Sequence, residues 1–299
     1  MRRYLLKIVL FFVLVAAVDF VFGRVCGYLA SHPKGGLTAN LRYICEASDE
    51  DILMLGSSRM QHHYVPGILR DSLGLSCYNA GIGGNGIILS YGLMEMILER
   101  YSPRIVLYDV SSFDMYADDN SRYIDNLKPF CPDHPELMEI LTDVNPAEKW
   151  KVRSGLYRYN SQLLALLRDY VHPAQSLDSG YWPLQGVMDY EPEIPHGTIP
   201  EVDPLKMNYL KKFIDLCRSH GVTLVFIASP TYFGASLSAD NDPAKRLCES
   251  TGVPFLDFYA DSLLCSAKEY WADAVHLNDS GAQVFTRQIA GVLKTYTGF

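Results

Sequence analysis

The sequence has little that would hold a metal ion. Its seven cysteines are scattered along 299 residues, and no two are spaced like the paired ligands of a structural zinc site. We therefore expect no metal site. One or two disulfides would suit an exported domain, but the spacing does not indicate which cysteines would pair. Internal repeats and low-complexity tracts are also missing from the sequence.

Positive charge is scarce as well. The formal net charge is −8, and the first 30 residues contribute +3, which leaves −11 for the rest of the chain. A chain of this charge without a basic stripe would repel phosphate backbones, so nucleic acid is not an expected partner. With 48% apolar and 12% aromatic residues, the composition is that of a globular protein.

One long apolar run is present, at the N-terminus. After a basic start, Ile8–Val18 is uncharged, and Phe20–Phe22 extends the run past Asp19. A cleaved signal peptide would fit this short core, and Val15-Ala16-Ala17 offers a cleavage site. A retained anchor fits the 19-residue span Tyr4–Phe22, which is about the length that a bilayer requires. We favour a retained anchor within residues 1–30, with its basic end inside and the domain outside the cytoplasmic membrane.

The remaining chain alternates between strand and helix patterns. After a linker at residues 31–48, a main domain is expected at 49–299. Short apolar runs predict strands at Ile52–Leu55, Ser76–Tyr78, Ile105–Tyr108, Thr223–Ile227 and Phe255–Leu256. Helical patterns lie at Val65–Leu73, Ile87–Tyr101, Lys206–His220, Pro243–Thr251 and Ser280–Tyr296. This alternation predicts an α/β fold with a flavodoxin-like, doubly wound parallel five-stranded sheet.

A long excursion separates the third and fourth predicted strands. It covers residues 115–204, which is too long for an ordinary connection, so we expect an insertion or lid subdomain. One helical pattern lies near Ser161–Tyr170. Four aromatic residues of the excursion could stack on sugar rings or form the core of the subdomain. These are Tyr157, Tyr159, Tyr181 and Trp182.

Polar motifs follow the predicted strands, where ligands bind in such sheets. Gly56-Ser57-Ser58 follows the first strand, "NAGIGGNG" at 79–86 follows the second, and 109–114 follows the third. "DAVHLNDSG" at 273–281 precedes the last helix. A serine hydroxyl becomes a nucleophile when a base takes its proton, and a carboxylate three residues before a histidine can orient that base. Alone, Gly56-Ser57-Ser58 would favour a helix N-cap over a nucleophile, and the Asp273–His276 stretch reverses that preference.

These four stretches resemble the SGNH, or GDSL-type, hydrolases and acyltransferases. The resemblance spans most of residues 50–112 and 205–297. The subgroup that the chain looks most like is the membrane-anchored bacterial envelope proteins that handle acyl groups on glycans, including the DltD-like branch. The resemblance implies a location in the bacterial cell envelope. The domain would be periplasmic, or secreted if the N-terminal segment is cleaved.

The resemblance also assigns roles to individual residues. Ser58 falls on the family's nucleophile, and Ser57 replaces the aspartate of Gly-Asp-Ser. His276 falls on the catalytic base and Asp273 on the acid that orients it. The backbone N–H groups of Ser58 and Gly84 fall on the oxyanion hole, where glycine lets the backbone approach the substrate.

The third motif departs from the family pattern. Where the family has Gly-x-Asn-Asp, this chain has Ser111-Ser112-Phe113-Asp114, with Phe113 in the asparagine register. A phenyl ring donates no hydrogen bond, and losing one oxyanion donor costs roughly a hundredfold or more in rate. Ser111 or Ser112 could replace that donor or contact the substrate.

Three further residues are candidates for substrate binding. Arg59 could bind a carboxylate or phosphate of the substrate, or pair with Asp109 or Asp114. Asn85 lies in the second motif, and Tyr232 follows the fourth strand. His62 and His63 are given no role. A phosphate-binding loop is disfavoured because the glycine-rich stretch lacks the lysine and hydroxyl of a P-loop.

The sequence therefore predicts a serine esterase or O-acyltransferase. Its substrate would be ester-linked acyl groups, acetyl above all, on an envelope or extracellular glycan, and it would need no cofactor. The membrane, and a membrane-bound acyltransferase, are further predicted partners. The alternative is a non-catalytic glycan-binding or accessory protein of a membrane O-acyltransferase system. A flavodoxin-like phosphate-binding or nucleotide-binding protein ranks third.

Overall fold

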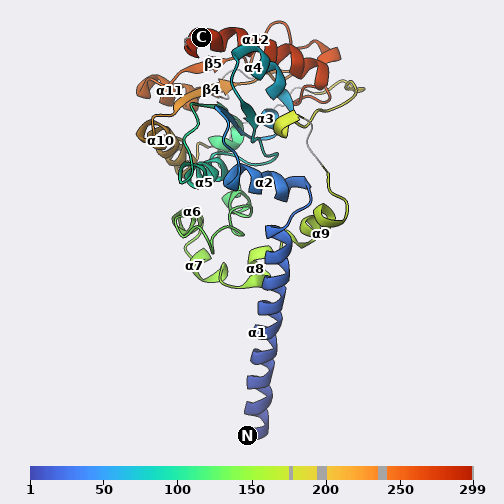
Figure 1. The fold of residues 1–299 in the computed structure, drawn as a ribbon, viewed down its shortest axis with the longest axis vertical. Helices are drawn as coiled ribbons and strands as arrows, with labels where there is room; N and C mark the ends of the chain where they lie inside the picture. Colours follow the sequence, from blue (N-terminus) through green and yellow to red (C-terminus); the bar gives the residue numbers. More distant parts are fainter. Residues whose placement is uncertain (175–177, 194–200, 235–240, 298–299) are drawn as a thin grey trace. The chain divides into compact units, whose positions relative to one another are not determined.

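The chain forms two compact units. The computed structural model describes residues 1–174, 178–193, 201–234 and 241–297. The smaller unit comprises Met1–Arg42 and Asn120–Gln175, and the larger one comprises Tyr43–Asp119 and Ser176–Phe299. The larger unit holds the β-sheet, and the smaller one holds the N-terminal helix (Figure 1).

The sheet has five parallel strands in the order β2-β1-β3-β4-β5. They are β1 (Ile52–Gly56), β2 (Cys77–Asn79), β3 (Ile105–Asp109), β4 (Thr223–Ala228) and β5 (Phe255–Asp257). This order is the flavodoxin-like one, so the predicted fold class is confirmed. Every residue of β1, β2 and β3 is buried, as expected for parallel strands that are covered on both faces.

Helices cover both faces of the sheet. They are α3 (Ser58–His63), α4 (Pro66–Leu73), α5 (Ile87–Leu98), α10 (Pro204–Ser219), α11 (Asp242–Thr251) and α12 (Asp279–Thr297). On one face, α12 packs against α3 and α4, and its Phe285 shares a buried cluster with Ile52 and Met54 of β1. On the other face, α10 packs against α5, and the ring of its Phe213 lies 5.3 Å from that of Tyr108 on β3. The described part of this unit also contains the short 3₁₀ helices η1 (Ser112–Asp114), η3 (Asp178–Gly180) and η6 (Lys268–Tyr270).

Two expected segments are organised differently in the structure. The expected linker at 31–48 contains a helix, α2 (Gly36–Glu46). The insertion at 115–204 divides between the units, because its stretch Asn120–Gln175 belongs to the smaller one. Residues 178–188 instead hydrogen-bond to the sheet unit, through Tyr181, Trp182 and Met188 among others.

The smaller unit is helical. It contains α1 (Arg2–Ser31), η2 (Asn120–Ile124), α6 (Leu137–Val144), α7 (Glu148–Lys151), α8 (Gly155–Tyr159) and α9 (Leu163–Val171). By length and composition α1 could cross a membrane, and being near the N-terminus it would also suit a signal sequence. Both the anchor and the signal-peptide predictions are compatible with this helix.

The two halves of α1 differ in their surroundings. Residues 1–18 are exposed throughout. The second half packs on α8 and α9, where Cys26 and Ala30 share a buried cluster with Tyr159 and Leu166. The Asp19 carboxylate accepts hydrogen bonds from Ser154 Oγ and from two backbone N–H groups at the start of α8. The second half of α1 is therefore a structural part of this unit.

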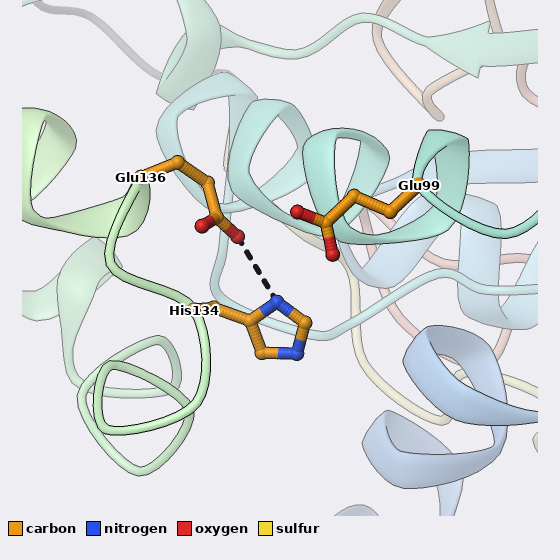
Figure 2. Close-up of side chains that lie close together, drawn as sticks. All are labelled: Glu99, His134 and Glu136. Atoms are coloured by element: carbon orange, nitrogen blue, oxygen red, sulfur yellow. Dashed lines mark hydrogen bonds and ion pairs between the residues drawn. The ribbon is translucent and has the colours of Figure 1, made fainter.

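A histidine and a glutamate lie close together just before α6. In the smaller unit, His134 Nδ1 lies 3.0 Å from Glu136 Oε1 just before α6 (Figure 2). The third side chain drawn there, Glu99, belongs to the sheet unit.

All seven cysteines are free thiols, six of them buried. The disulfides that export would permit are therefore not formed in this structure.

Candidate active site

The site begins where β1 gives way to α3. Gly56 ends the strand with φ +150°, and a Cβ atom there would lie 2.8 Å from the carbonyl oxygen of Asp109. Only glycine fits both the backbone angle and the close approach. Ser57 then precedes the helix, but its side chain makes no capping hydrogen bond. Ser58 is the first residue of α3 and stands at the carboxyl end of a central strand, where ligands of such sheets bind.

Three side chains form one hydrogen-bonded line at this point. His276 Nε2 lies 2.8 Å from Ser58 Oγ. On the other side of the ring, His276 Nδ1 lies 2.9 Å from Asp273 Oδ2 and 3.1 Å from Oδ1. A carboxylate that accepts from Nδ1–H leaves Nε2 unprotonated and able to take the serine proton. The structure thus brings together the three residues for which the sequence predicts a catalytic triad.

Asp273 is held in its ionised form. Partial burial opposes ionisation, but hydrogen bonds from His276 and from the backbone N–H of Val275 outweigh it and lower the pKa of Asp273 to about 2. The backbone nitrogens of Val275 and His276 both donate to Asp273 Oδ1 and lie within 3 Å of it. The carboxylate is therefore a fixed negative charge beside the imidazole at any pH near neutral.

The loop that carries this pair is closed at its base. Trp271 and Leu277 form an antiparallel bridge, and the Ala272 N–H donates to the carbonyl oxygen of His276. Trp271 is fully buried and donates from Nε1 to the Leu264 carbonyl oxygen. These contacts fix the loop on the core, so the imidazole is presented to Ser58 by a rigid support.

His62 and His63, to which the sequence analysis gives no role, lie beside this loop. His63 is completely buried, and its Nε2 accepts the backbone N–H of Leu277 at 3.0 Å. Burial holds the pKa of His63 well below its usual value, so this acceptor stays neutral. The ring of His62 packs edge-on against that of His276, with 5.5 Å between centroids. His62 and His63 follow Ser58 by four and five residues on one short helix. This spacing was the signal in the sequence that they lie near the serine.

A segment of the long insertion also borders the site. The Trp182 N–H donates to the Gln61 carbonyl oxygen, and the carbonyl oxygen of Trp182 lies 2.6 Å from His62 Nδ1. Tyr181 donates its hydroxyl hydrogen to Asp279 at the start of α12. These residues were predicted as sugar-stacking or core aromatics. The structure places both against elements of the sheet unit, within the surroundings of the triad.

The glycine-rich motif lies next to the serine. A Cβ atom built on Gly83 would lie 3.7 Å from Ser58 Cβ, so this loop passes directly beside Ser58. Gly84 follows with φ +71° and is exposed. Asn85 is buried, and its side chain donates to the Gly83 carbonyl oxygen. Asn85 therefore shapes the loop, while the roles of Gly84 and Ser58 as oxyanion donors remain predictions.

The third motif, residues 111–114, folds around the buried carboxylate of Asp114. Asp114 is fully buried and accepts hydrogen bonds from Tyr108 Oη and from the backbone N–H and side chain of Ser111. Burial raises the pKa of Asp114 to about 6, although these hydrogen bonds and one from the Ile87 N–H oppose the rise. Ser111 is thus engaged within the motif, and Ser112 is exposed. The Phe113 carbonyl lies against Gly86, ahead of α5.

Arg59 is built into the protein rather than presented at its surface. Its side chain is buried and donates to the carbonyl oxygens of Ser229 and Val110, just beyond β4 and β3. Asp109 accepts from the N–H and hydroxyl of the same Ser229. Of the two predicted roles, these contacts favour the structural one: Arg59 joins two strand ends and offsets the buried charge of Asp109.

Tyr232 and the aromatic residues of the smaller unit complete the predicted set. The Tyr232 N–H donates to the Ala274 carbonyl oxygen in the loop that carries Asp273 and His276, and the Tyr232 ring packs edge-on against that of Trp271. In the smaller unit Tyr159 is buried in the helical core, and Tyr157 donates to Glu148. Tyr157 and Tyr159 are therefore placed as structural residues of that unit.

Comparisons with known proteins return structural similarities only. No family model matches the chain, and no curated protein matches it. A candidate acylhydrolase from Bacteroides fragilis is 13% identical with a TM-score of 0.44, covering 89% of this chain and 99% of that chain. A candidate lipolytic protein of the G-D-S-L family from Desulfitobacterium hafniense is 10% identical with a TM-score of 0.42, covering 81% and 98%. Axe2, an acetylxylan esterase from Geobacillus stearothermophilus, is 14% identical with a TM-score of 0.42, covering 83% and 94%. At such low similarity, the function has to be argued from the site itself.

Proposed function

We propose that this chain is a serine esterase or O-acyltransferase of the SGNH type. The observation that carries the proposal is the unbroken hydrogen-bonded line from Ser58 through His276 to Asp273. The proposed substrates are ester-linked acyl groups, acetyl above all, on a glycan of the cell envelope. With α1 as a membrane anchor, the domain would act on the outer side of the cytoplasmic membrane.

The geometry supports a two-step acyl transfer. His276 Nε2 takes the proton of Ser58 as Oγ attacks the ester carbonyl, and Asp273 stabilises the imidazolium that forms. The N–H groups of Ser58 and Gly84 would hold the oxyanion of the tetrahedral intermediate. His276 then returns the proton to the leaving alkoxide, which gives an acyl-enzyme and a free alcohol. Water or a sugar hydroxyl attacks the acyl-enzyme next, again with His276 as base.

The first test compares neighbouring serines in the full-length chain. We expect Ser58→Ala and His276→Ala each to lower kcat/KM for p-nitrophenyl acetate by about 10³-fold or more. Ser57→Ala is the matched control, because Ser57 adjoins Ser58 but its side chain makes no capping hydrogen bond. This variant should stay within about threefold of the wild type. A fluorophosphonate probe should label Ser58 alone, as read by peptide mass mapping.

The accessory-protein alternative gives the opposite result. It is favoured by one observation, the phenylalanine at position 113 in the register of an oxyanion donor. A folded wild type that neither hydrolyses the ester nor reacts with the probe would support it and contradict the enzyme proposal. If the ester is hydrolysed, acetate release and acetyl transfer from an O-acetylated oligosaccharide, measured in parallel, separate esterase from transferase.

A further inference from the structure

The smaller unit contains a groove that lies along α1. One wall is the face of α1 from Asp19 to His32, and the other comes from residues 129–133 and from the α7–α8 region. The groove holds about 1200 Å³ of space, part of it open to solvent. Gly23 and Gly27 keep the α1 wall low, and α8 approaches so closely that a Cβ atom on Gly155 would lie 2.5 Å from Gly23 Cα.

Four arginines line this groove, in a chain that is acidic overall. They are Arg24, Arg42, Arg153 and Arg158, and the acidic residues of the lining are Asp19 and Asp133. Asp19 already accepts three hydrogen bonds at the start of α8. Among the residues that the structure describes, no carboxylate forms an ion pair with Arg24 or Arg153, whereas Arg158 interacts electrostatically with Asp19. The groove therefore presents a surplus of positive charge.

Two of the arginines are held in place by neutral groups. Arg42 Nε donates to the carbonyl oxygen of Ala30, and Arg158 Nε donates to that of Val152. The Arg153 guanidinium lies 4.6 Å from the ring centroid of Trp150. These contacts orient the guanidinium groups, whose planar donors suit the oxygens of a phosphate.

With α1 as a membrane anchor, the groove includes the level at which the helix leaves the hydrocarbon core of the bilayer. At 1.5 Å per residue, a core of about 30 Å takes roughly 20 residues, so an α1 that enters at Tyr4 reaches the other side near Gly23. Phe20, at that end of the groove, is 68% exposed. Trp150 and Leu156 are also exposed in the same unit, at 64% and 38%. An exposed tryptophan flanked by Lys149 and Arg153 is typical of a membrane–water interface.

We propose that this groove binds the phosphate headgroup of an anionic membrane lipid. The arginines would hold the phosphate, and the acyl chains would continue into the bilayer along the exposed apolar face of α1 beyond Phe20. The bound lipid would fix the smaller unit at the membrane surface. This site is separate from the triad, which lies in the sheet unit, so the proposal does not depend on the esterase function.

The test uses the full-length chain in a neutral detergent. It is titrated with dihexanoyl phosphatidylglycerol, with dihexanoyl phosphatidylcholine and with inorganic phosphate, and binding is measured by calorimetry and native mass spectrometry. We expect one phosphatidylglycerol to bind at least about tenfold more tightly than phosphatidylcholine. Arg24→Gln/Arg153→Gln should weaken that binding about tenfold or more. Both side chains are exposed and neither donates to backbone, so this variant is expected to fold.

A charge-matched variant serves as the control. Arg246→Gln/Arg287→Gln removes the same charge from exposed positions of the sheet unit and should bind phosphatidylglycerol within about twofold of the wild type. An equal loss of phosphatidylglycerol affinity in both variants would show that the lipid is held by the general charge of the protein, and would overturn the proposed site. If Arg24→Gln/Arg153→Gln binds phosphatidylglycerol as tightly as the wild type, and limited proteolysis shows that α1 is still as protected as in the wild type, the proposal is overturned too. Inorganic phosphate binding as tightly as the lipid would assign the groove to soluble phosphates and overturn the lipid assignment.

Discussion

At the scale of single residues, the site separates the groups that we propose to react from groups that hold the fold. Ser58 and His276 are partly exposed, whereas Arg59, His63 and Asp109 are buried around them. The buried groups bond to backbone atoms and, for Asp109, also to the Ser229 hydroxyl, which fixes the strand ends and the loop that carries His276. Pre-organisation of this kind lets a serine and a histidine remain at hydrogen-bond distance without a substrate.

Arg59 gives a test of the difference between these two kinds of residue. Arg59→Met would leave the carbonyls of Ser229 and Val110 without their donor and the Asp109 charge without its nearest cation. We expect the free energy of unfolding to fall by about 3 kcal/mol, measured by urea denaturation. Arg59→Lys keeps the positive charge, so its free energy of unfolding should fall by less.

The kinetic half of the test addresses the substrate-binding hypothesis for Arg59. If its role is structural, the ratio of KM values for a carboxylate-bearing aryl ester and a neutral one should not change in Arg59→Lys. An increase of that ratio by about tenfold, with stability retained, would instead show that the guanidinium binds the substrate anion.

At the scale of elements, the start of α5 depends on a carboxyl group from the neighbouring strand end. Asp114 accepts hydrogen bonds from Ser111 and Tyr108, and also from the N–H of Ile87, the first residue of α5. Gly86, which precedes the helix, is needed there because a Cβ atom would lie 2.9 Å from the Phe113 carbonyl oxygen. The third motif therefore positions a helix, whatever part it plays in catalysis.

This buried carboxyl group predicts a pH dependence of stability. The pKa of Asp114 is about 6 in the folded chain against 3.8 as its ordinary value, so the folded state binds its proton more tightly. The free energy of unfolding should therefore fall as the pH rises from about 4 to about 6, and then level off. Relative to Asp114→Asn, the wild type should lose up to about 3 kcal/mol over this range, measured by urea denaturation at each pH.

Asp273 supplies the matched control for this titration. Its pKa is lowered to about 2, so its stabilising contribution is complete above about pH 4 and is lost only as the pH falls towards 2. The difference in free energy of unfolding between Asp273→Asn and the wild type should therefore stay constant between pH 4 and 6. A stability difference between wild type and Asp114→Asn that does not vary with pH would contradict the assignment.

The sequence was most informative about regular elements and about the triad. Apolar runs predicted all five strands to within two residues, because both faces of a parallel sheet are buried. The Asp-x-x-His spacing placed Asp273 and His276 together because three residues in a loop allow that contact. It could not predict the contact of His63 with Leu277, which lies 214 residues away. Nor could it predict residues 178–188 beside α3, since that loop has no periodic pattern.

At the scale of the whole molecule, α1 serves two purposes at once. Its first half is an exposed apolar rod, and its second half supplies Asp19, Cys26 and Ala30 to the core of the smaller unit. A chain shortened within α1 should therefore behave very differently according to where it is cut. This dependence would not arise if residues 1–30 were only a membrane anchor joined by a linker.

Two truncations test this view in the same detergent. A chain that starts at Asp19 keeps the α8 cap and the buried cluster, so limited proteolysis should leave residues 120–174 as protected as in the full-length chain. A chain that starts at His32 loses both, and the same segment should be cut rapidly because its core is left open. Ester turnover should survive in both, since the triad lies in the sheet unit. Equal protection in the two truncated chains would show that α1 is dispensable for the smaller unit.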